Sequence, residues 1–142
     1  MHIFGYKSTE RSWLDQANVR FDEYHLIDYG IQKEEALKLI RNASVIFLLG
    51  GNVVEQNGLL IEYELSDLIE KSRAIVMGAS AGAINMSAKW LCSKYTVYKG
   101  EISSIYDGIG LDDFFVLFIL ILNILQAFQL KQLMVVYLYV LK

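Results

Sequence analysis

The chain has no proline, one cysteine and two histidines among its 142 residues. Without proline there is no proline-rich linker, and the single cysteine, Cys92, cannot build a disulfide framework or a cysteine-based metal site. We therefore expect a buried, unreactive thiol at Cys92, and neither a metal nor another cofactor. Positive charge is also scarce, because 13 Lys and Arg face 16 Asp and Glu and the net charge is −3. The absence of a basic patch argues against nucleic acid as a partner.

The first residues, MHIFGYKSTERSW, lack the apolar core of about 7–15 residues that marks a secretory signal. Together with the lone cysteine, this start predicts a cytoplasmic protein. The oligomeric state is not indicated by any pattern in the sequence.

Short apolar runs alternate with amphipathic segments between residues 24 and 91. SVIFLL (44–49) and RAIVM (73–77) are typical of strands buried on both faces of a parallel sheet. Helical spacing of apolar residues characterises KEEALKLIR and LLIEYELSDLIEK. The predicted order is strand 24–29, helix 33–41, strand 44–49, helix 59–71, strand 73–77 and helix 81–91. This alternation predicts an α/β domain in which helices cover a mainly parallel sheet. Beyond it, residues 94–102 predict a strand pair or edge segment, and 106–114 a turn.

A serine stands between two glycines where the strand 73–77 gives way to a helix. The stretch Gly78-Ala79-Ser80-Ala81-Gly82 fits G-x-S-x-G in the strand–turn–helix context of a nucleophile elbow. In that role Ser80 is the catalytic nucleophile, and Gly78 and Gly82 let neighbouring backbone pass close. The N–H of Ala81 is the natural first donor to a developing oxyanion. The alternative is that Ser80 is only a helix N-cap, a position that serine favours.

A second glycine turn, Gly50-Gly51-Asn52, ends the preceding strand. Carboxyl ends of neighbouring parallel strands meet at one sheet edge, so this loop is expected beside Ser80. We choose the N–H of Gly51 as the second oxyanion donor, with Gly50 and Asn52 shaping the loop. The alternative is a turn that merely ends the strand.

These two motifs resemble peptidase family S51, the dipeptidase E and cyanophycinase group. The likeness runs through VIFLLGGNVVEQNGLLIEYEL and AIVMGASAGAINMSAKW, covers roughly residues 20–117, and includes YDGIGLDDFFV. It implies a class I glutamine amidotransferase-like fold, a three-layer sandwich with a mainly parallel sheet. It also implies a serine peptidase that hydrolyses short peptides or peptide-like amides through a Ser80 acyl-enzyme.

The chain departs from this family in its catalytic base. The family histidine follows the serine turn, whereas this chain has only His2 and His25, which both precede it. For His25 a packed or surface role is expected, and nothing singles out Glu101 or Asp107 as the acidic partner. Family members also begin with two strands and a helix that this chain has little room for. We therefore expect an incomplete domain with very low or no activity.

The apolar tail, residues 114–142, is treated separately from the partial peptidase domain, residues 1–113. Residues 114–130 carry no charge, and the tail is long enough for a membrane helix, which needs about 20 apolar residues. Five polar residues count against such a span: Asn123, Gln126, Gln129, Lys131 and Gln132. The tail could instead be a core element.

A third interpretation is that the tail is out of frame. Residues 119–124 can be encoded ATT TTG ATA TTG AAT ATT, and a preceding C from the Phe118 codon shifts this to His-Phe-Asp-Ile-Glu-Tyr. A histidine would then stand where the resemblance requires one. The rival functions are thus an impaired serine peptidase, an inactive remnant or binding module on the same fold, and a tail-anchored membrane protein.

Overall fold

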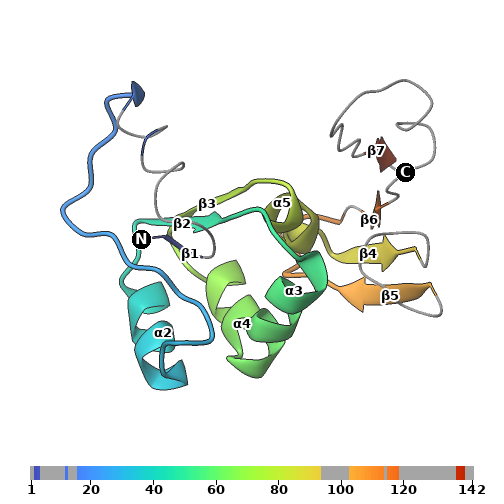
Figure 1. Ribbon diagram of the computed structural model, residues 1–142, viewed down its shortest axis with the longest axis horizontal. Helices are drawn as coiled ribbons and strands as arrows, with labels where there is room; N and C mark the ends of the chain where they lie inside the picture. Colours follow the sequence, from blue (N-terminus) through green and yellow to red (C-terminus); the bar gives the residue numbers. More distant parts are fainter. Residues whose placement is uncertain are drawn as a thin grey trace.

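The computed structural model describes residues 2–3, 12, 16–93, 103–113, 115–118 and 137–139 (Figure 1). Within them the chain is an α/β structure with a small, mostly parallel sheet and helices, as the alternating pattern predicts.

The first sheet consists of β1 (His2–Ile3), β2 (Val45–Leu48) and β3 (Ile75–Gly78), in the order β1-β2-β3. Both neighbouring pairs are parallel, and β2 pairs with β3 from Val45↔Ile75 to Leu48↔Gly78. The strands predicted at 44–49 and 73–77 are therefore confirmed, but their predicted burial on both faces is wrong. In β2 buried and half-buried residues alternate, and no residue of β3 is buried, with Ile75 65% exposed. Because β2 and β3 end level with each other, the loops that follow them lie side by side.

Three helices, α2 (Lys33–Arg41), α3 (Val53–Glu62) and α4 (Leu65–Glu70), lie together on one side of these strands in Figure 1. The predicted helix 33–41 coincides with α2, which has glutamates in its first turn and basic residues in its last, as the helix dipole favours.

The predicted helix 59–71 is wrong in its bounds, because α3 begins at Val53 and the helix breaks before α4. Asn52 caps α3, so the helix starts as soon as the glycine turn ends. Glu64, with φ 56°, turns the chain sharply between α3 and α4. The break allows Leu60 and Leu65, on either side of it, to reach the same core.

The predicted strand at 24–29 is also wrong, since these residues form neither helix nor strand. Ile27 is nevertheless fully buried. Strand β2 has a hydrogen-bonded neighbour on each side, β1 and β3, so residues 24–29 do not pair with it.

The last predicted helix, 81–91, is too long. The helix observed there, α5, spans only Ala81–Met86, and Lys89–Cys92 form strand β4 instead. Trp90 in β4 is fully buried and stacks on Tyr106, with ring centroids 4.3 Å apart. This cross-strand burial outweighs the local helical preference of the segment. Cys92 is buried and not in a disulfide, as expected.

A second sheet contains β4, β5 (Ser104–Asp107), β6 (Phe115–Phe118) and β7 (Tyr137–Tyr139), in the order β5-β4-β6-β7. β4 runs antiparallel to β5 and parallel to β6. The turn predicted at 106–114 begins too early, because residues 106–107 belong to β5 and the chain leaves the strand only at Gly108. Residues 94–102 and 114 lie outside the described residues.

The described parts of the tail are strands β6 and β7, and β6 pairs directly with β4. The remainder of 114–142, with the polar positions 123–132, lies outside the described residues. In the portion of the chain that the structure covers, no helix combines the length and apolar character needed to cross a membrane.

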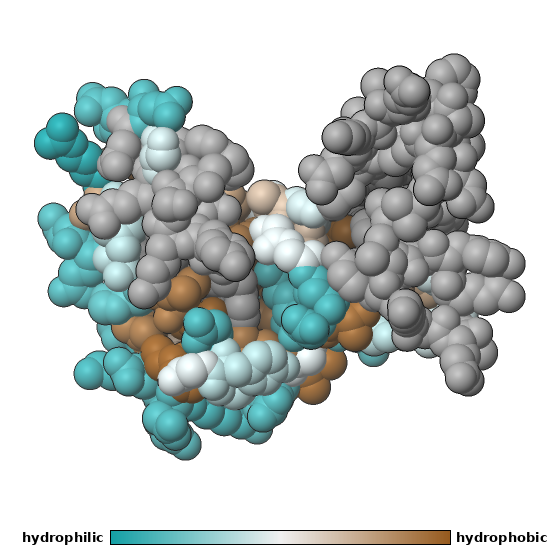
Figure 2. All heavy atoms as spheres, in the orientation of Figure 1, coloured by the Kyte–Doolittle hydropathy of each residue, from teal (hydrophilic) through white to brown (hydrophobic). Residues whose placement is uncertain are grey.

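The main core lies between the first sheet and helices α2 to α4, and contains Ile40, Ile46, Leu48, Leu60 and Leu65. Figure 2 shows hydrophilic residues over the outer side of the helices and hydrophobic ones between them. A second cluster packs α3 and α5 against β4, with Val53, Ile84 and Trp90 among its members. The two cores together fix α5, whose first residue follows Ser80.

Candidate active site

Ser80 occupies a strained turn between β3 and α5. Its φ is 53° and its ψ is −113°. Residues other than glycine adopt such a backbone conformation rarely, and at a cost of about 1–3 kcal/mol. Ser80 holds the N-cap position, yet its side chain makes no capping hydrogen bond to α5. The alternative that this serine serves to cap the helix is therefore wrong. Strain of this kind in a hydroxyl-bearing residue is typical of a nucleophile elbow.

The glycines at both ends of the turn are required by close packing. A Cβ on Gly82 would lie 2.0 Å from the carbonyl oxygen of Leu48, and one on Gly78 would lie 2.7 Å from the amide nitrogen of Ala83. A backbone hydrogen bond also holds the serine turn close to Leu48, because the N–H of Ala79 donates to Leu48 O at 2.9 Å. The turn is thus pressed against the end of β2.

The glycine loop, Gly50-Gly51-Asn52, lies against this turn. A Cβ on Gly50 would sit 3.4 Å from the Cβ of Ser80 and 3.9 Å from its Oγ. Gly51 has φ 141°, which favours glycine whatever the surrounding space. The side chain of Asn52 accepts hydrogen bonds from Val54 N at 3.0 Å and Glu55 N at 3.3 Å, which ends the loop by starting α3.

The structure therefore brings together every predicted site residue: Ser80, Ala81, Gly50, Gly51, Asn52, Gly78 and Gly82. Ala81 is the first residue of α5, so the helix itself offers no acceptor for its N–H. The oxyanion roles of Ala81 and Gly51 and the nucleophilic role of Ser80 stay predictions.

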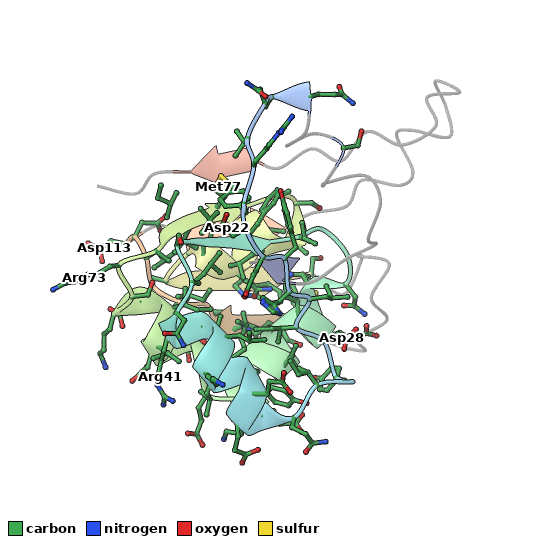
Figure 3. The ribbon with its side chains drawn as sticks, turned by 90° about the vertical axis from the view of Figure 1, so that its left-hand side faces the viewer. Asp22, Asp28, Arg41, Arg73, Met77 and Asp113 are labelled. Atoms are coloured by element: carbon green, nitrogen blue, oxygen red, sulfur yellow. The ribbon has the colours of Figure 1, made fainter. Side chains whose placement is uncertain are left out.

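A small cavity of about 150 Å³ adjoins the glycine loop. Its lining residues come from the segment before α2, from the loop and from α3: Asp28, Tyr29, Gly50, Gly51, Asn52, Glu55, Gln56 and Leu59. Figure 3 shows Asp28 on the opposite side of the molecule from Arg73, which precedes β3. Burial, and then the carboxylates of Glu62 and Glu55, raise the pKa of the Tyr29 hydroxyl above its ordinary value. The cavity thus presents two carboxyl side chains and a neutral phenol.

Three buried side-chain amides that were not identified from the sequence lie on α3 and α5, the helices that follow the glycine loop and the Ser80 turn. Gln56 and Asn57 in α3 and Asn85 in α5 hydrogen-bond to one another and to nearby backbone. The available signal was the pair Gln56-Asn57 between the apolar residues 53–54 and 59–61, because polar residues on a buried helix face need hydrogen-bond partners.

Two of the candidate base and acid residues, His25 and Asp107, form ion pairs with other side chains. His25 pairs with Glu23 at 3.0 Å, and its side chain is 38% exposed. Asp107 in β5 is exposed and forms an ion pair with Lys89. His2 lies in β1, while its side chain and the whole of Glu101 lie outside what the structure describes.

Within the described ranges, no group of three or more His, Cys, Asp or Glu side chains is placed to hold a metal ion. Comparison of the sequence with models of known protein families found no match, and comparison with curated proteins found none either. The resemblance to the dipeptidase E and cyanophycinase group therefore rests on the two glycine motifs and their spacing.

Proposed function

We propose that the chain is a serine-hydrolase domain similar to the dipeptidase E and cyanophycinase group, acting on short peptides or peptide-like amides in the cytoplasm. The observation that carries the proposal is Ser80 itself. A serine held at positive φ at the carboxyl end of a parallel strand, without a capping role and against a glycine loop, has the geometry of an activated-nucleophile turn. The proposed fold is the three-layer sandwich of the class I glutamine amidotransferases.

In the proposed reaction, Ser80 Oγ attacks the carbonyl carbon of a peptide bond. The carbonyl oxygen becomes an oxyanion that the N–H groups of Ala81 and Gly51 stabilise. Collapse of the intermediate expels the amine and leaves an acyl group on Ser80, which water then removes. The cavity beside Gly50 and Gly51 supplies space for a small side chain or terminal group of the substrate.

The attack requires a base to accept the hydroxyl proton. The two histidines of the chain both precede Ser80, and His25 is paired with Glu23 at the surface. Loss of one triad member lowers the rate by several orders of magnitude. We therefore propose very low turnover for this chain.

A fluorophosphonate reagent, which reacts covalently with activated serines, tests the proposal. Labelling is followed by mass spectrometry with and without added imidazole as an external base. We expect slow labelling of Ser80 that accelerates with imidazole concentration, and none at that position in Ser80→Ala. Ser87→Ala is the matched control, because Ser87 also stands at an end of α5, at the end opposite to Ser80 and the glycine loop. If Ser80 reacts no faster than a surface serine in either condition, the proposed function is wrong.

A second candidate function is a non-catalytic module that binds short peptides at the same site. The absence of any histidine after Ser80 favours it. Calorimetric titration with dipeptides distinguishes the two functions, since a binding module retains peptide affinity while Ser80 stays unlabelled even with imidazole.

A further inference from the structure

We propose that Gln56, Asn57 and Asn85 are positioning residues that hold the glycine loop and the Ser80 turn in a fixed relation. Their effect on the reactivity of Ser80 rests on the proposed function. Their structural role is argued from their own hydrogen bonds. All three side chains are buried, with exposures of 6%, 3% and 0% respectively.

The carbonyl oxygen of Leu49 joins the two loops. Leu49 directly precedes the glycine loop, and its oxygen accepts hydrogen bonds from Gln56 Nε2 at 2.8 Å and from the N–H of Gly82 at 3.1 Å. Gly82 follows Ser80 by two residues in the turn. One backbone acceptor therefore connects α3 to the Ser80 turn, immediately next to Gly50.

Asn85 holds Gln56 in place from the other side. Its Nδ2 donates to Gln56 Oε1 at 2.9 Å and to Val53 O at 3.1 Å. Because Asn85 belongs to α5, the helix that starts beside Ser80 is tied to the first turn of α3. A side-chain amide suits this position since it both donates and accepts.

Asn57 extends the network to the end of β5. Its Nδ2 lies 3.2 Å from Asn85 Oδ1 and 2.8 Å from Asp107 O, and the N–H of Ile109 donates to the backbone oxygen of Asn85 at 2.7 Å. Three parts of the chain that are distant in sequence are thus held together by buried amides. Removing one amide leaves buried partners unsatisfied, which is costly in an apolar interior.

The experiment compares Gln56→Met, which keeps the length of the side chain but removes its donor and acceptor, with Ser87→Ala. Two readouts are used: imidazole-supported labelling of Ser80, separated into reagent affinity and maximal rate, and hydrogen exchange at the Gly82 amide. In Gln56→Met we expect the maximal labelling rate to fall and the Gly82 exchange rate to rise, each roughly 5- to 30-fold, with reagent affinity unchanged. Ser87→Ala removes a hydroxyl that lies 2.7 Å from Ile84 O and 3.1 Å from Lys89 O, but it is expected to leave both readouts as in the wild type.

Gln56→Glu is the second variant and covers the case in which Gln56→Met does not fold. A protonated carboxyl group can donate to Leu49 O and accept from Asn85, whereas the ionised form cannot donate. The ratio of variant to wild-type labelling is therefore expected to rise as the pH is lowered.

Unchanged labelling and unchanged Gly82 exchange in Gln56→Met would overturn the inference. So would equal effects in Ser87→Ala, which would show general destabilisation. If wild-type Ser80 is not labelled at all, the proposed function fails, and the Gly82 exchange comparison alone decides whether the amides position the turn.

Discussion

Gly82→Ala is the substitution for which the structure makes the sharpest prediction. In an ordinary helix this change stabilises by about 1 kcal/mol, because alanine restricts the unfolded chain. Here the new Cβ would lie 2.0 Å from Leu48 O and 2.4 Å from Leu48 C. Contacts that short require the backbone itself to move.

The backbone of Leu48 has little freedom to move away. Leu48 is fully buried, its oxygen accepts the N–H of Ala79 at 2.9 Å, and it pairs with Gly78 in the sheet. Overpacking of a core costs about 1–3 kcal/mol and occasionally more. Taking the upper part of that range and subtracting the helix preference, Gly82→Ala should lose roughly 2 kcal/mol or more of unfolding free energy.

Urea unfolding followed by the fluorescence of the buried Trp90 measures this loss. A loss of 2 kcal/mol lowers the midpoint by roughly 1 M for an ordinary dependence on urea. Gly58→Ala is the matched control, because Gly58 lies inside α3 and its Cβ would meet only the hydroxyl of Tyr29, at 3.3 Å. Tyr29 is 56% exposed and can rotate away, so the control should be stabilised by about 0.5–1 kcal/mol. Equal stability of Gly82→Ala and wild type would refute the packing of the serine turn on β2.

Four further predictions concern the turn, the loop, the cavity and the gene. Ser80→Gly should be more stable than Ser80→Ala by roughly 1 kcal/mol in urea unfolding, because glycine relieves the positive φ; the opposite order would contradict the strain. Asn52→Ala should lose about 1 kcal/mol through the missing cap, whereas Asn52→Asp should retain most of it, and equal losses would exclude the capping role. The raised pKa of Tyr29 means that its contribution to stability is present at neutral pH and lost as pH rises above about 10. Urea unfolding across that range should therefore show wild type falling relative to Tyr29→Phe. Sequencing the DNA after the Phe118 codon should reveal CAT TTT GAT ATT GAA TAT in the alternative frame, and immediate stop codons there would end that hypothesis.

Much of the candidate site could be predicted because its signals are local. The glycines of G-x-S-x-G and of the loop 50–52 stand where strands end, and the apolar runs before them identify those strands. Parallel neighbours then place both loops at one edge. The amide network could not be predicted in this way, since Asn85 lies 28 or more residues from its side-chain partners in α3.

The sequence by itself determined helix α2, the two parallel strands β2 and β3, and the tight glycine-flanked serine between β3 and α5. Each of these follows from hydrophobic periodicity or from the conformational freedom of glycine, which act over a few neighbouring residues. Only the tertiary structure decided that β1, and not residues 24–29, pairs with β2, that the chain turns at Glu64, and that Trp90 belongs to a strand. Those outcomes depend on which distant segment completes a sheet edge or covers an apolar side chain. Such long-range pairing leaves little trace in the local pattern.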